Sequence, residues 1–217
     1  MTLPQRLRYA LPLTTALLVP QNTLAQQAEA PAEPAREDLH YVGLIGSVVQ
    51  LRSLESAITN DDDDITNVIA DSANLNTGSL IIGGHISELF HAEIRLGGGL
   101  SEAKVRNDLT LSLDYFASWY FGIHYPLTDF ANGYAQFGFT HLQGEAELVN
   151  PDANRNSRFD DLVGDFPDSS FSASWLIGLD MELFDNAYLV LEGGKLFEDT
   201  VTDITGYQFS SGLRYEF

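Results

Sequence analysis

Eight ionisable residues stand at alternate positions within stretches that are otherwise apolar or small, so each shares a face with small polar neighbours. They are Glu93, Arg95, Asp114, Asp180, Glu182, Glu192, Arg214 and Glu216. Carboxylates and guanidinium groups confined to one face can neutralise one another, and an excess of acids there attracts cations. Spacing from the ends of their segments predicts that Glu192 and Arg214 lie level on neighbouring strands. For Arg95 the sequence offers three candidate partners, Glu93, Asp114 and Asp180.

Two interpretations of this charged face remain open. In the first, the charges form a plug of salt bridges that fills a narrow interior, as side chains fill small barrels. In the second, they form a gate in a small cation-preferring pore, because acids outnumber arginines on the face and acidic rings favour cations.

A second group of carboxylates lies in polar connecting segments. Its members are Asp61, Asp62, Asp63 and Asp64 in one segment and Asp152, Asp160 and Asp161 in another. Such runs are usually solvated surface, but Ca²⁺ or Mg²⁺ would take oxygen ligands of this kind. The segment from Asp152 begins like a calcium loop, yet Ser157 replaces the expected glycine and Val163 the bidentate glutamate. We expect no other cofactor.

Residues for catalysis are sparse. The chain has no cysteine, which excludes thiol chemistry and thiolate metal sites. A lipid-facing acyl hydrolase would need a serine beside a histidine. His141 is expected on the outer face near one rim, but the residue two positions on is Gln143. We therefore expect no enzymatic activity.

The stretch that positions the charged face most clearly is 204–217. Phe217, Tyr215, Leu213 and Phe209 alternate there with Glu216 and other polar or small residues. A period of two indicates a β-strand with one apolar and one polar face. Eight segments of this character follow one another, at 39–53, 79–90, 91–101, 108–125, 133–147, 170–184, 187–198 and 204–217.

The fourth segment, 108–125, is predicted to place Leu109, Leu111 and Leu113 on the same outward face as Trp119. Short links alternate with longer polar ones, the two longest being 54–78 and 148–168. This pattern predicts an all-β, eight-stranded, antiparallel up-and-down transmembrane β-barrel, with both chain ends on the side of the short turns. Open sheet edges are not tolerated in lipid, so the sheet must close.

The first 25 residues have the order of a signal peptide: two arginines, an apolar run and small residues before a cleavage site after Ala25. Residues 26–38 are rich in Ala, Pro and Glu and are expected to form a flexible periplasmic leader, with the barrel at 39–217. Removing two arginines and no acids would take the net charge from −20 to −22. So acidic a chain is a poor partner for nucleic acid.

Together with the strand count and the terminal Phe217, the phrase from His91 to Gly99 (HAEIRLGGG) resembles small eight-stranded outer-membrane barrels of the outer membrane protein A and X and opacity-protein type. The resemblance implies residence in the outer membrane and insertion by the barrel assembly machinery, with Leu213, Tyr215 and Phe217 as the assembly signal. We expect the barrel to stand without a peptidoglycan-binding domain.

The sequence predicts a monomeric, non-enzymatic barrel in contact with outer-membrane lipid and lipopolysaccharide. Its expected role is structural or interactive: envelope integrity, adhesion or binding through acidic extracellular loops. The alternative is the small cation-preferring pore. Interfacial aromatic girdles are expected from residues that include Tyr115, Trp119, Tyr125, Trp175, Tyr188, Tyr207 and Tyr215.

Overall fold

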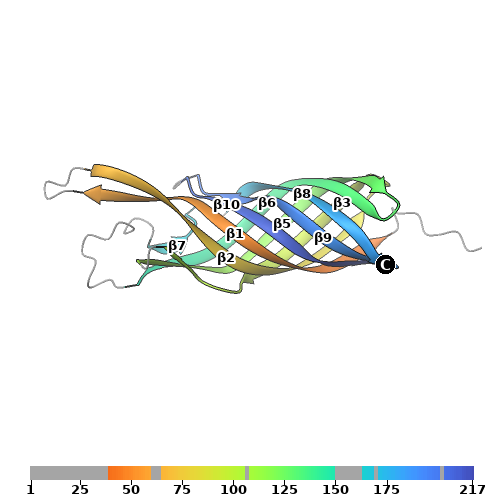
Figure 1. Cartoon of the computed structure of the whole chain (residues 1–217), viewed down its shortest axis with the longest axis horizontal. Coiled ribbons are helices and arrows are strands. Elements are labelled where there is room, and N and C mark those ends of the chain that lie inside the picture. Colours follow the sequence, from red (N-terminus) through yellow and green to blue (C-terminus); the bar gives the residue numbers. More distant parts are fainter. Residues whose placement is uncertain (1–38, 60–64, 106–107, 150–162, 169–170, 201–202) are drawn as a thin grey trace, which may run out of the picture. The chain divides into compact units, whose positions relative to one another are not determined.

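A computed structural model describes residues 39–59, 65–105, 108–149, 163–168, 171–200 and 203–217 (Figure 1). The predicted signal peptide and leader (1–38) and the predicted cation-binding aspartates lie outside these ranges. Ten strands are described. They are β1 (His40–Thr59), β2 (Ile65–His85), β3 (Phe90–Gly99), β4 (Ala103–Val105), β5 (Leu109–Thr128), β6 (Ala131–Leu148), β7 (Gly164–Phe166), β8 (Phe171–Phe184), β9 (Ala187–Glu198) and β10 (Thr205–Glu216).

Eight of these strands form a closed ring. Each long strand pairs antiparallel with the next along the chain, in the order β1, β2, β3, β5, β6, β8, β9, β10. The ring closes where β1 pairs with β10, from Tyr41 opposite Glu216 to Arg52 opposite Thr205. The short strands β4 and β7 pair only with β5 and β6. The predicted eight-stranded up-and-down barrel is confirmed.

Short turns and the two described chain ends share one rim of the ring. Strands β2–β3, β5–β6 and β8–β9 are joined there by links of a few residues. The backbones of His40 and Phe217 hydrogen-bond to each other in both directions, at 2.9 and 2.8 Å. We call this the turn end and the opposite rim, where the longer links lie, the loop end.

Alternation along the strands separates the wall of the barrel into two chemically different faces. On β10, Leu213 and Tyr215 are 58% and 50% exposed, whereas Arg214 and Glu216 are 3% and 2% exposed. The outer wall carries large apolar side chains that the chain leaves uncovered: Val42, Leu44, Val48, Leu80, Ile82, Ile94, Leu96, Trp119, Phe121, Ile123, Phe137, Phe171, Trp175, Ile177, Leu179, Leu191, Phe209 and Leu213. An apolar band of this kind is suited to hydrocarbon. Within the described ranges no helix is long and apolar enough to cross a membrane.

A β-bulge in β5 corrects the predicted face of its first residues. The register against β6 shifts between Leu113 and Tyr115, so that Asp114 is the extra residue. An extra residue exchanges the two faces of a strand. Leu109, Leu111 and Leu113 therefore point inward and are buried, whereas Asp114 is exposed.

Much of the first long link, predicted as a loop at 54–78, is strand. Strands β1 and β2 stay paired beyond the last rung that β1 shares with β10, from Leu54 opposite Asp71 to Thr59 opposite Ile65. In Figure 1 this hairpin, drawn in orange, projects past the ring. A register shift between Leu51 and Leu54, with Ser53 at φ 64°, marks where the hairpin leaves the ring.

The loop-end half of the interior is an apolar core, which was not predicted from the sequence. Its buried side chains come from the ring and from both short strands: Val49, Leu51, Leu54, Ala73, Leu75, Ala103, Val105, Leu109, Leu111, Leu113, Phe116, Leu142, Ala146, Phe166, Leu196, Phe197 and Ile204. We call this set the apolar cap. The short strands contribute Ala103 and Val105 from β4 and Phe166 from β7, so this end of the interior is a buried hydrophobic cluster.

Candidate functional site

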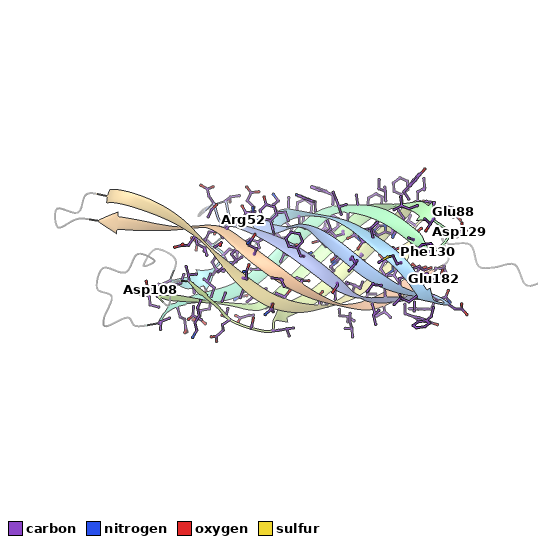
Figure 2. All side chains as sticks on the ribbon, viewed as in Figure 1. Arg52, Glu88, Asp108, Asp129, Phe130 and Glu182 are labelled. Atoms are coloured by element: carbon purple, nitrogen blue, oxygen red, sulfur yellow. The ribbon has the colours of Figure 1, made fainter. Side chains whose placement is uncertain are left out.

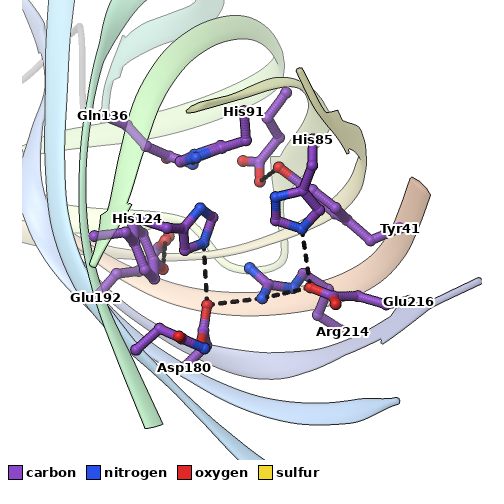
Figure 3. A network of polar contacts seen from close by, with 12 residues as sticks. Tyr41, His85, His91, His124, Gln136, Asp180, Glu192, Arg214 and Glu216 are labelled. Atoms are coloured by element: carbon purple, nitrogen blue, oxygen red, sulfur yellow. Dashed lines mark hydrogen bonds and ion pairs between the residues drawn. The ribbon is translucent and has the colours of Figure 1, made fainter. Parts of the chain in front are cut away.

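The charged residues gather in the turn-end half of the interior, as two linked clusters (Figure 3). The first is centred on Arg95 of β3. Its guanidinium donates to Glu93, to both carboxylate oxygens of Glu192 on β9, and to Gln136 Oε1 at 3.1 Å. Tyr134 on β6 adds a donor to Glu192 at 2.8 Å. All five side chains are buried, so the ion pairs are shielded from water.

The second cluster is centred on Arg214 of β10 and lies nearer the turn end. Its Nη2 lies 2.7 Å from Asp180 Oδ2 and 3.0 Å from Glu216 Oε1. Each carboxylate also meets an imidazole, His124 Nε2 for Asp180 and His85 Nε2 for Glu216, both at 3.2 Å.

Tyr41 and His91 join the two clusters. Tyr41 donates to Glu93 Oε2 at 3.1 Å, while the Arg214 guanidinium lies 4.8 Å from the centre of its ring. The His91 ring packs against His124 at 4.1 Å between centroids and accepts a hydrogen bond from Gln136 at 2.7 Å. A change in either cluster therefore reaches the other through direct contacts.

Two guanidinium groups, those of Arg95 and Arg214, meet four buried carboxylates in this interior. A buried carboxylate is costly unless it is paired and hydrogen-bonded. Neutral donors satisfy acceptors that the arginines do not reach, among them Tyr134 and Asn132, whose amide donates to Asp180 at 2.7 Å. We call the two clusters together the polar plug.

A layer of hydroxyl groups separates the polar plug from the apolar cap. Ser118 and Thr140 lie 2.7 Å apart, and Thr140 donates to Ser174 at 3.1 Å. All three are buried. The interior thus passes from charge to hydroxyls to hydrocarbon along its length, and the side chains at each level are buried.

Six of the eight predicted lumen charges come together in the plug: Glu93, Arg95, Asp180, Glu192, Arg214 and Glu216. Asp114 is exposed because of the bulge in β5. Glu182 is exposed near the turn end of β8, next to the register shift between Glu182 and Phe184 (Figure 2).

The predicted pairing of Glu192 with Arg214 is wrong. The register of β9 against β10 sets Glu192 opposite Ser210 and Arg214 opposite Tyr188. Glu192 instead reaches across the interior to Arg95, and Arg214 to Asp180. Of the candidate partners for Arg95, Glu93 binds it. Tyr188 packs 5.2 Å from the Arg214 guanidinium, so it is half-buried rather than part of an exposed girdle.

The histidine group formed by His85, His91 and His124 was not predicted from the sequence. The rings of His85 and His91 lie 6.4 Å apart, and that of His85 lies 5.2 Å from His124. A signal was present: the short β2–β3 turn places His85 opposite His91 in the register. Among the described residues no group of His, Cys, Asp or Glu has the geometry to hold a metal ion.

On the outer wall, His141 Nε2 lies 3.3 Å from the Tyr115 hydroxyl, which donates to Gln143 at 2.9 Å. In the part of the chain that the structure describes, the residues opposite His141 on the two neighbouring strands are Ala117 and Phe171, and neither is the serine that an acyl hydrolase would need. The predicted assembly residues Leu213, Tyr215 and Phe217 all face outward, between 50% and 61% exposed.

Comparison with known proteins finds similar structures but no related sequence family. No family model and no curated protein sequence matches the chain. Among solved structures it is similar to the outer membrane protein OprG from Pseudomonas aeruginosa, with a TM-score of 0.51 and 10% identity over 84% of this chain and 98% of that one. Neisserial surface protein A matches with a TM-score of 0.49 and 15% identity, over 82% and 97% of the two chains. Ail, the attachment invasion locus protein of Yersinia pestis, matches with 0.45 and 10%, over 82% and 98%.

The fold is that of the small outer-membrane β-barrels. At these low sequence identities the structural similarity supports the fold alone, and the role of the protein is inferred from this chain's own residues.

Proposed function

We propose that this chain is an integral, non-enzymatic protein of the bacterial outer membrane, with a closed interior and a structural or surface-interaction role. The observation that carries the proposal is the filling of the interior by the polar plug, the hydroxyl layer and the apolar cap. Water and ions need a continuous polar path, and a packed layer of leucine, valine and phenylalanine side chains opposes one.

The outer wall supports the membrane location. A water-soluble barrel would expose polar groups there, whereas this wall presents Leu, Ile, Phe and Trp around the ring. Closure of β1 on β10 leaves the ring no unpaired edge, which lipid requires. In this proposal the signal peptide at 1–25 directs export, 26–38 is a periplasmic leader, and the barrel assembly machinery inserts 39–217.

The loop end is the proposed interaction surface. With the turn end in the periplasm, the loop end and its β1–β2 hairpin face the outside of the cell. The chain has 31 acidic against 11 basic residues, so this surface favours cationic partners or divalent ions that bridge it to other anions. Adhesion and envelope integrity are the roles that such a surface on a closed barrel would serve.

Single-channel recording from the refolded mature chain in a planar bilayer tests the closed interior. A shift in gel migration on boiling identifies the folded barrel, and a large porin in the same bilayer is the positive control. The proposal predicts no discrete openings from folded protein. Cation-selective openings that change with Arg214→Ala would establish the pore alternative instead.

A further inference from the structure

Two cationic side chains flank one tyrosine on the outer wall, near the loop end. Tyr207 of β10 lies opposite Gln50 of β1 on one side and opposite Lys195 of β9 on the other. Arg52 follows two residues after Gln50 and is exposed (Figure 2). We call Arg52, Tyr207 and Lys195 the basic row.

Arg52 is held in a geometry that can receive an anion. Its Nε and Nη2 donate to Gln50 Oε1 at 2.8 and 2.6 Å, and its guanidinium lies 5.1 Å from the centre of the Tyr207 ring. These contacts use two of the five N–H donors of a guanidinium. The remaining donors can bind a phosphate, because the planar guanidinium can donate two parallel hydrogen bonds to a pair of phosphate oxygens.

Lys195 completes the row. Its amine lies 2.6 Å from Glu198 Oε2, in a pair whose glutamate is half exposed. An exposed pair of this kind contributes little free energy, so the amine can turn to a doubly charged phosphate. With Glu198 counted, the site keeps a net positive charge in a chain of net charge −20.

The position of these cations is unusual for this chain. Five lysines and arginines lie in the described ranges: Arg52, Arg95, Lys104, Lys195 and Arg214. Arg95 and Arg214 are buried in the polar plug, and Lys104 lies on β4. The other two, Arg52 and Lys195, lie on opposite sides of Tyr207.

An apolar groove of about 730 Å³ adjoins the row on the turn-end side. Trp175, Ile177, Leu191 and Phe209 line it, and Gly193 lies among them. A Cβ on Gly193 would lie 3.2 Å from the Phe209 ring, so any larger residue there would narrow the groove. Its size and lining suit a hydrocarbon chain.

The row lies where lipid headgroups would be. Tyr207 and Tyr215 are separated by eight residues of β10, which is about 20 Å along the barrel axis for strands of ordinary rise and tilt. Tyr215 is near the turn end and Tyr207 near the loop end, so the two tyrosines mark opposite edges of an apolar band about 25 Å tall. The row therefore meets the outer leaflet at its headgroups and the groove meets the acyl chains below.

We infer that the outer wall of β8, β9, β10 and β1 binds one phosphorylated, acylated lipid of the outer leaflet, with a phosphate on Arg52 and Lys195 and an acyl chain in the groove over Gly193. This inference rests on the proposed membrane location. Charge complementarity selects the occupant, because an uncharged lipid would leave the two cations without an anion.

Native mass spectrometry of the refolded mature chain in detergent tests the site, with diphosphorylated lipid A as the probe. Arg52→Ala is expected to weaken binding about tenfold, and Arg52→Ala with Lys195→Ala more than either alone. Glu198→Gln, which frees Lys195, is expected to strengthen it. Lys104→Ala removes a positive charge elsewhere on the surface and is the matched control, with binding within about twofold of the parent chain.

Three further measurements can overturn the inference. Equal binding of lipid A and its dephosphorylated form would mean that the groove alone selects the lipid. Displacement of the lipid by millimolar inorganic phosphate would indicate a free-anion site, and equal binding by the parent chain and the double variant would exclude the basic row. Gel migration before boiling distinguishes failure of the proposed function from failure of the lipid site. An unfolded chain refutes the barrel proposal, whereas a folded barrel without phosphate-dependent binding refutes only this site.

Discussion

The ion pair between Arg95 and Glu192 offers the sharpest test of the polar plug. Arg95→Met leaves two buried carboxylates, Glu93 and Glu192, without their guanidinium. Removing one partner of a buried pair costs about 3–5 kcal/mol. Glu192→Gln keeps the shape and an acceptor for Tyr134 but removes the charge, at about 2–3 kcal/mol.

The double variant distinguishes this pairing from the one predicted by sequence. Arg95→Met with Glu192→Gln removes both charges, so its loss of stability should fall short of the sum by about 1.5 kcal/mol or more. The matched cycle, Arg214→Met with Glu192→Gln, should be nearer additive because Arg214 pairs with Asp180 and Glu216 instead.

The assay is reversible urea unfolding in lipid vesicles, followed by tryptophan fluorescence. Trp119 and Trp175 both lie on the outer wall, at 50% and 39% exposed, and would move from lipid to water on unfolding. Coupling in the Arg214 cycle that equals or exceeds that in the Arg95 cycle would refute the assigned network.

Three further outcomes follow from the same structure. Leu142→Ala in the apolar cap should lower the free energy of unfolding by about 2–5 kcal/mol in that assay, because it opens a cavity among buried side chains. A loss below about 1 kcal/mol would mean that the cap is loosely packed. Asp180→Asn should destabilise the barrel, since it weakens the contacts with Arg214 and His124. Asp114→Asn at the exposed bulge should change the free energy of unfolding by no more than about 0.5 kcal/mol. A larger loss for Asp114→Asn than for Asp180→Asn would place Asp114 in the interior. Phe217→Ser keeps the backbone hydrogen bonds to His40, so it should leave refolding in detergent unchanged. It should nevertheless reduce the amount of folded barrel recovered from cell envelopes. Equal recovery of the variant and the parent chain would exclude Phe217 from the assembly signal.

The alternation of apolar and polar residues predicted the fold, because successive residues of a barrel strand face lipid and lumen in turn, and lipid requires apolar side chains whereas the lumen accepts polar ones. The closing strand β10 shows this best: all of its predicted outward and inward residues lie on the expected faces. Six lumen charges were found by the same argument, since each interrupts an apolar pattern with the correct phase.

What alternation could not supply was any change of phase or any contact across the ring. The bulge at Asp114 shifts one strand by one residue, and nothing in 108–125 distinguishes it from continuous strand, so three core leucines were assigned to lipid. The partner of Glu192 depends on strand stagger and the width of the interior, which together bring β9 to face β3. The polar composition of 54–78 favours a loop, yet residues 54–59 and 65–78 belong to the paired strands β1 and β2.

Cysteine accessibility in the hydroxyl layer tests the closed interior most directly, because the chain has no cysteine of its own. Ser174 is fully buried between the polar plug and the apolar cap, and Ser101 is exposed at the loop end. In folded barrels in vesicles, a charged thiol reagent should label the Ser101→Cys variant within minutes and the Ser174→Cys variant only after unfolding. Equal labelling of both variants in the folded state would show that water reaches the interior, and would contradict the closed barrel.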